Sequence, residues 1–272
     1  MFHDGKFAYF CAQFQPVLVS MLVRSALALV PKLSSTDMAV LWPLLLSLVG
    51  YVAYWWVYYS PAIKERFLET LGGHRGVVAH TVAVKSWGFL VMAALPVWVL
   101  AQTGGWTLRT LGWAWPTNVD ATLWLWWGGL LLFSGLLSMM GAHKGFSKYP
   151  QMEVANWSWT TYAWSSFSWV MYLTGCEFMF RGYLLFPLSE LWGPWPAVIV
   201  STLLYSLSHF HKGKGELLLC LPAGVLMGWM TLQTGSMAHA LFGHVLLAWF
   251  NTAYNVSVKP ELAWVRRALR AS

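Results

Sequence analysis

Glu177, His209 and His244 are the side chains of this sequence best suited to chemistry, because each lies within a long apolar stretch in the last third of the chain. A charged side chain in a membrane helix costs about 2.5–3.5 kcal/mol on insertion scales, so it needs a partner or a function. A carboxylate and two imidazoles in a water-poor pocket are suited to general acid–base catalysis on a water molecule. The sequence contains neither GxSxG nor HExxH, which argues against an α/β-hydrolase serine site and a zincin site.

Two of these stretches carry further charged or titratable groups, and these groups also have a purely structural interpretation. Arg181 follows Glu177 by four residues, so the pair shares one helix face in the order that favours an ion pair. His209 alone could be a hydrogen-bonding residue of the helix interior, while His211, two residues later, points to the other side, beside Lys212.

The third stretch, residues 235–254, places His244 and Asn251 on nearly the same helix face, two turns apart. His239 differs from His244 in direction by about 140° on a helix, so one helix cannot easily aim both at one site. We interpret His239 as an interfacial residue. Glu216 ends a short charged loop and is either solvated or tethers that loop.

Composition defines the class of protein. Hydrophobic residues make up 58% of the 272 positions and charged residues only 10%, against about 25% charged in an average soluble domain. So few charges cannot cover a soluble surface of this size, which excludes a soluble globular protein, a disordered chain and a coiled coil. The apolar runs are long and do not alternate, which argues against a transmembrane barrel. We therefore expect an all-α, polytopic transmembrane helix bundle.

A membrane span needs about 20 mostly apolar residues, and seven stretches qualify. They are residues 38–59, 82–101, 121–140, 163–188, 194–211, 217–233 and 235–254. Residues 7–30 are either an eighth span or an interfacial amphipathic helix, so about 7–8 spans are expected. One membrane domain is predicted, with N-terminal helices at 1–145, core helices at 146–256 and a basic tail at 257–272.

Basic residues predict the orientation, because Lys and Arg collect on the cytoplasmic side. By alternation of the spans, most of them fall in loops on one side together with the C-terminal tail. Those residues are Lys64, Arg66, Arg75, Lys85, Lys144, Lys148, Lys212, Lys214, Lys259, Arg266, Arg267 and Arg270. We expect an integral protein of the cell (inner) membrane with these loops and the tail in the cytoplasm. The basic residues are scattered and form no motif, so no nucleic-acid partner is expected.

Together the three polar stretches resemble the CPBP family of intramembrane peptidases, the group of CAAX prenyl endopeptidases and bacteriocin-processing (Abi) proteins. That family is marked by EExxxR, FxxxH and HxxxN or HxxxD on separate membrane helices. Here Cys176-Glu177 through Arg181 corresponds to the first motif, Tyr205 through His209 to the second, and His244 begins the third. The resemblance covers about residues 150–254.

The resemblance implies an intramembrane endopeptidase that hydrolyses a peptide bond of a membrane-associated or lipidated protein. Its partners would be the lipid bilayer and a protein or peptide substrate. It implies that Glu177 and His209 act on a water molecule, that His244 faces the oxyanion, and that Arg181 orients Glu177. No cofactor is implied by this glutamate mechanism, but an older view of the family leaves a divalent metal at Glu177, His209 and His244 as an alternative.

The chain departs from the family pattern at two positions. The first Glu of the family is Cys176 here, and the Asn four residues after the last His is Ala248, with Asn251 one turn later as the candidate substitute. These departures favour a second hypothesis, a catalytically inactive membrane scaffold or chaperone. A third is a small-molecule transporter or a haem-binding membrane protein with His209 and His244 as paired ligands. A fourth, weaker one is a Cys176–His dyad.

Overall fold

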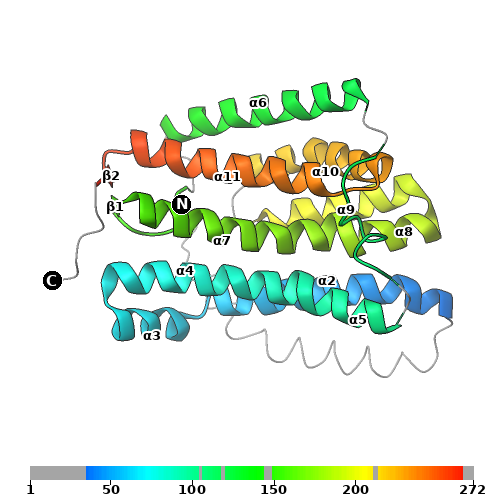
Figure 1. Cartoon of the computed structure of the whole chain (residues 1–272), viewed down its shortest axis with the longest axis horizontal. Coiled ribbons are helices and arrows are strands. Elements are labelled where there is room, and N and C mark those ends of the chain that lie inside the picture. The colour runs from blue at the N-terminus through cyan, green and yellow to red at the C-terminus, as the bar shows by residue number, and fades with distance from the viewer. Residues whose placement is uncertain (1–34, 104–105, 118–119, 144–148, 211–213, 266–272) are drawn as a thin grey trace.

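The computed structural model describes residues 35–103, 106–117, 120–143, 149–210 and 214–265, which form a bundle of long helices (Figure 1). In chain order, the N-terminal part contains α2 (Ser35–Tyr58), α3 (Pro61–Leu71), α4 (Gly73–Phe89), η2 (Leu90–Ala94), α5 (Leu95–Thr103) and α6 (Ala121–His143). The C-terminal part contains β1 (Asn156–Trp157), α7 (Trp159–Glu177), η3 (Phe178–Tyr183), α8 (Leu185–Trp192), α9 (Pro194–Ser208), α10 (Lys214–Thr234), α11 (Ala238–Val258) and β2 (Ala263–Trp264). The η elements are π-helical.

The bundle is a helical membrane bundle, which confirms the predicted fold class. Among the described residues, four helical segments are long and apolar enough to cross a membrane: Leu41–Tyr58, Gly73–Gln102, Ala121–His143 and Gly215–Thr234. The other predicted spans correspond to α7 with α8, to α9 and to α11, which are helical but carry hydroxyl, amide or imidazole groups or are short. The predicted span at residues 7–30 lies outside the described residues.

The expected single helix over residues 163–188 is wrong in one respect, because the structure interrupts it. Helix α7 ends at Glu177, six π-helical residues follow, and α8 begins at Leu185. Gly182 has a non-helical backbone (φ −94°, ψ −105°). A Cβ atom there would lie 3.0 Å from Cδ1 of Phe178 and 3.2 Å from the carbonyl oxygen of Leu111. Short π-helical segments often occur at functional sites.

Close packing of α4 against α7 positions the end of α7. A Cβ atom at Gly175 would lie 3.0 Å from the carbonyl oxygen of Gly88 and 3.2 Å from Cα of Phe89. Small residues let membrane helices approach closely, because lipid provides no hydrophobic drive for their association. The two glycines therefore bring the last turn of α7, which carries Glu177, against α4.

Hydrogen bonds join the other elements around this turn. Ser201 of α9 donates to the Phe180 carbonyl in η3 at 2.7 Å. Ser206 donates to the Leu217 carbonyl at 2.9 Å, which ties α9 to α10. Helix α11 packs against both α6 and α7 (Figure 1). The ends of α7 and α9 and the first turns of α11 thus meet in the interior of the bundle.

Two features differ from the predicted organisation. Lys85, expected in a basic loop, lies inside α4 and is only 2% exposed. Its Nζ lies 3.1 Å from the centroid of the Trp169 ring, a cation–π contact that makes burial of the ammonium group tolerable. In addition, Asn156–Trp157 pairs in parallel with Ala263–Trp264, a two-residue ladder within an otherwise helical fold among the described residues. The tail arginines lie outside the described residues.

Candidate active site

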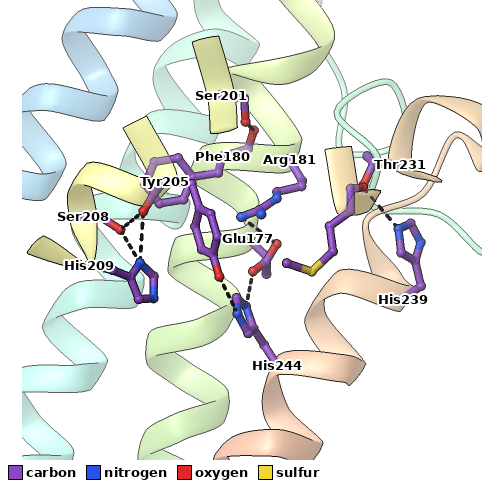
Figure 2. A network of polar contacts seen from close by, with 11 residues as sticks. Glu177, Phe180, Arg181, Ser201, Tyr205, Ser208, His209, Thr231, His239 and His244 are labelled. Atoms are coloured by element: carbon purple, nitrogen blue, oxygen red, sulfur yellow. Dashed lines mark hydrogen bonds and ion pairs between the residues drawn. The ribbon is translucent and has the colours of Figure 1, made fainter. Parts of the chain in front are cut away.

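Glu177 is the centre of a buried polar network (Figure 2). Its side chain is 0% exposed. Oε1 accepts a hydrogen bond from Nδ1 of His244 on α11, and Oε2 lies 3.4 Å from Nη1 of Arg181. The acid is therefore held between a cation from its own chain segment and an imidazole from another helix, as a carboxylate deep in a membrane bundle requires.

Arg181 is 1% exposed and lies between the Glu177 carboxylate and the aromatic face of Tyr205. Its Cζ is 4.1 Å from the Tyr205 ring centroid. No side-chain nitrogen of Arg181 has a hydrogen-bond partner among the described residues, so charge pairing and the cation–π contact hold the guanidinium. The expected pairing of Arg181 with Glu177 is present, across the transition from α7 to η3.

Tyr205 extends the network toward the interior of the bundle. Its Oη lies 2.9 Å from Nε2 of His244. In a neutral ring whose Nδ1–H points at Glu177, Nε2 is the acceptor, so the phenol donates. Tyr205, His244 and Glu177 thus form a row of hydrogen bonds. The hydroxyl of Tyr205 had no role in the sequence interpretation; the signal was a Tyr at the aromatic position four residues before His209.

His209 lies at the C-terminal cap of α9 and faces its own helix end. Its Nδ1 lies 3.0 Å from the Tyr205 carbonyl oxygen and 3.1 Å from Oγ of Ser208. The ring packs on Tyr205 with centroids 4.7 Å apart. Donation from Nδ1–H to the carbonyl leaves Nε2 as the acceptor nitrogen of a neutral ring. The histidine is therefore oriented by the backbone of the residue that also contacts His244.

A cavity of about 700 Å³ lies beside this network, between α2, α6, α7, α9, α10 and α11. Its wall includes Cys176, Tyr205, His209, Glu216 and His244. Glu177 and Arg181 do not line the cavity, whereas Tyr205 and His244, which contact them, do. Of the three groups expected to converge, the two histidines reach the cavity directly, and the acid reaches it only through His244.

The remaining predicted residues lie at the edge of this arrangement. Asn251 is on the cavity wall, and its Oδ1 accepts a hydrogen bond from Ser138 of α6. Ala248 is also on the wall. His239, interpreted as interfacial, is instead 2% exposed and directs Nε2 toward the Met227 carbonyl at 3.4 Å. It points away from His244 (Figure 2), as the 140° difference along the helix predicts.

The network does not fit a divalent metal at Glu177, His209 and His244. Within the part of the chain that the structure describes, no group of three or more His, Cys, Asp or Glu side chains is arranged to hold a metal ion. One carboxylate oxygen faces the Arg181 guanidinium, and the ring nitrogens of His244 are engaged by Glu177 and Tyr205.

Residues 157–250 match the family model described as type II CAAX prenyl endopeptidase Rce1-like. The matched segment runs from β1 into α11 and contains Glu177, Arg181, Tyr205, His209 and His244. No curated protein and no solved structure gives a significant match to the chain. The resemblance expected from the three motifs is thereby confirmed, and with its apolar helices the chain is an integral membrane protein with a core similar to CAAX-type intramembrane proteases.

Proposed function

We propose that the chain is an intramembrane endopeptidase that hydrolyses a peptide bond in a membrane-associated or lipidated protein. The observation that carries the proposal is the buried hydrogen bond between Glu177 and His244 beside a 700 Å³ cavity inside the bundle. A carboxylate that orients an imidazole at Nδ1 makes the other side of the ring a stronger base, as in the catalytic triads of other hydrolases. The similarity of residues 157–250 to CAAX prenyl endopeptidases supports a peptide bond as the target.

In this proposal Glu177 acts through His244, because the acid is sealed from the cavity. Arg181 keeps Glu177 ionised and fixes its position. His209, on the cavity wall, positions the attacking water. We place His244 in the path of the proton, since both of its ring nitrogens are engaged. Asn251 is left as a wall residue of the substrate cavity.

We further propose that the end of the bundle formed by α3 and the end of α11 faces the cytoplasm. Lys64 on α3 pairs with Glu153 at 2.6 Å, and Lys259 donates to the Tyr149 carbonyl at 2.7 Å. These contacts place Lys64 of one predicted loop and Lys259 of the tail at the same end of the molecule as residues 149–153, as the bias of Lys and Arg toward the cytoplasm favours.

The function is tested with the purified protein in liposomes and a farnesylated peptide carrying a C-terminal CAAX sequence. We expect wild-type protein to release the C-terminal fragment and His209→Gln to be slower by about 10²-fold, because a misplaced attacking water can cost that much. His143→Gln is the matched control, because His143 bonds the Tyr254 hydroxyl at 2.7 Å on the exposed side of the bundle. Absence of cleavage by wild type, for the prenylated and the unprenylated peptide alike, would support the inactive scaffold instead.

Substitutions of Cys176 distinguish the remaining hypotheses for the catalytic group. We expect Cys176→Ala to keep activity within about tenfold of wild type, because loss of a true acid–base group costs about 10²–10⁴-fold. The thiol is 7% exposed among apolar neighbours, where cysteine is usually inert. Loss of activity in Cys176→Ala and on thiol alkylation would identify a cysteine nucleophile. An inactive wild type that gains activity as Cys176→Glu would show that the chain lacks an indispensable carboxylate.

A further inference from the structure

We infer that Tyr205 is the catalytic residue through which the Glu177–His244 pair acts on the cavity: its hydroxyl carries the proton between His244 and the reacting groups. The inference rests on the proposed function and deepens it, since neither the family motifs nor the family match assigns a role to this hydroxyl.

The first argument is which group of the network can contact water in the cavity. Glu177 is fully buried and absent from the cavity wall. His244 is committed at Nδ1 to Glu177 and at Nε2 to Tyr205. A phenol oxygen has one hydrogen and two lone pairs, so Tyr205 can donate to His244 and still accept a hydrogen bond from water in the cavity whose wall it forms. His244 also lies on the cavity wall, but both of its ring nitrogens are already engaged, so Tyr205 is the member of the row that keeps a hydrogen-bonding position for a water molecule.

Electrostatics is the second argument. As the Tyr205 proton moves to His244, partial negative charge develops on the phenol until the water proton reaches it, and positive charge develops on the imidazole. The Arg181 guanidinium lies 4.1 Å from the Tyr205 ring centroid, where it stabilises the first charge. The Glu177 carboxylate at Nδ1 stabilises the second. Fixed charges aimed at developing charge in a water-poor site are the strongest form of catalytic stabilisation.

The proton balance closes without any further reagent. As the water oxygen attacks the peptide carbonyl carbon, one water proton passes to Tyr205 Oη, and the original Tyr205 proton passes to His244 Nε2. The carbonyl π bond opens to give a tetrahedral oxyanion. When the C–N bond breaks, His244 returns its proton to Tyr205, which protonates the leaving nitrogen. The products are a carboxylic acid and an amine, and Tyr205 and His244 regain their starting forms.

Residue identity is the third argument. The resembled family has Phe in its FxxxH motif, whereas this chain has Tyr205 there, and it has Cys176 where the family has its first Glu. The chain therefore lacks one proton-carrying group at the cavity and has gained another on the same wall. A phenylalanine at position 205 would keep the ring contacts and remove the hydroxyl.

Tyr205→Phe tests the role in turnover. We expect kcat for the farnesylated peptide to fall by at least about 10²-fold with KM nearly unchanged, because the lost group acts on the transferred proton. The matched control is Tyr254→Phe, which removes the hydroxyl of an exposed Tyr–His pair away from the cavity; its kcat should equal that of wild type. A purely structural role of Tyr205 would raise KM or lower the melting temperature and leave the pH–rate profile in place, and that result would overturn the inference.

A labelling experiment tests Tyr205 even if no peptide is cleaved. Benzenesulfonyl fluoride reacts with an activated phenol: oxygen bonds to sulfur, fluoride leaves, and His244 takes the phenol proton. We expect Tyr205 to be modified at least about tenfold faster than Tyr54, Tyr58 and Tyr172, which line the same cavity. Glu177→Gln should abolish this preference. Equal labelling of the four tyrosines overturns the inference, while selective labelling with no peptide cleavage overturns only the endopeptidase proposal.

Discussion

Replacing Arg181 by methionine lowers the free energy of unfolding by about 3–5 kcal/mol, the cost of leaving a buried charge without its partner. Glu177 has no exposed surface, and its Oε2 has Arg181 as its cationic neighbour at 3.4 Å. Methionine keeps most of the side-chain volume, so the effect reports the lost charge and not a cavity. The expected result is a lower melting temperature and a lower abundance in the membrane fraction, measured by thermal unfolding in detergent and by quantitative blotting.

The double variant Glu177→Gln/Arg181→Met shows whether the pair is responsible. Removing both charges leaves no uncompensated ion, so most of the stability should return. Arg109→Met is the control, since Arg109 is exposed and its loss should change stability by less than about 0.5 kcal/mol. If Arg181→Met were as abundant and stable as wild type but inactive, Arg181 would act in the reaction itself and not as a positioning residue.

Replacing Glu177 by glutamine lowers the cleavage rate by at least about 10³-fold, as expected when the acid that fixes a catalytic histidine is neutralised. The amide of glutamine keeps the size of the side chain but cannot stabilise an imidazolium at Nδ1 of His244. It also leaves Arg181 without its carboxylate, so folded protein is measured separately by thermal unfolding. The quantity compared is kcat per folded molecule for the farnesylated peptide.

Glu216→Gln is the informative counterpart, because Glu216 is the carboxylate on the cavity wall among the described residues. We expect it to reduce kcat by less than about tenfold, below the range for a general acid–base group. A large loss in Glu216→Gln together with a small loss in Glu177→Gln would assign the proton chemistry to the carboxylate on the cavity wall and not to the buried one.

Much of the site could be predicted from helical periodicity and from the free-energy cost of placing polar groups in lipid. The i, i+4 spacing of Glu177 and Arg181 predicts their ion pair, and the price of polar groups in lipid predicts that helices carrying Glu177, His209 and His244 meet. The 140° difference between His239 and His244 predicts that only one of them faces the site. These features depend on helix geometry alone, which the sequence determines locally.

Other features depend on tertiary contacts and could not be predicted. Helix α9 stops at Ser208, so His209 turns back on the Tyr205 carbonyl instead of pointing at Glu177. Lys85 was counted with the basic loop residues, but it lies within α4, where the face of Trp169 contacts its ammonium group. The local sequence does not indicate at which residue a membrane helix ends. It also does not indicate an aromatic partner that lies 84 positions away.

The π-helical segment at residues 178–183 constrains how this chain can change over evolution. Each residue of an α-helix turns the chain by about 100°, and a π-helical turn commonly contains one residue more than the α-helical turn it replaces. Loss of one residue between Phe178 and Tyr183 would restore a regular helix and rotate everything after it, including α8, by about that angle relative to Glu177. The length of the segment is fixed by the geometry of the Glu177–Arg181 pair, and its side chains are all buried. Insertions and deletions should therefore be tolerated in the loops between helices, whereas within residues 178–183 they should disrupt the site.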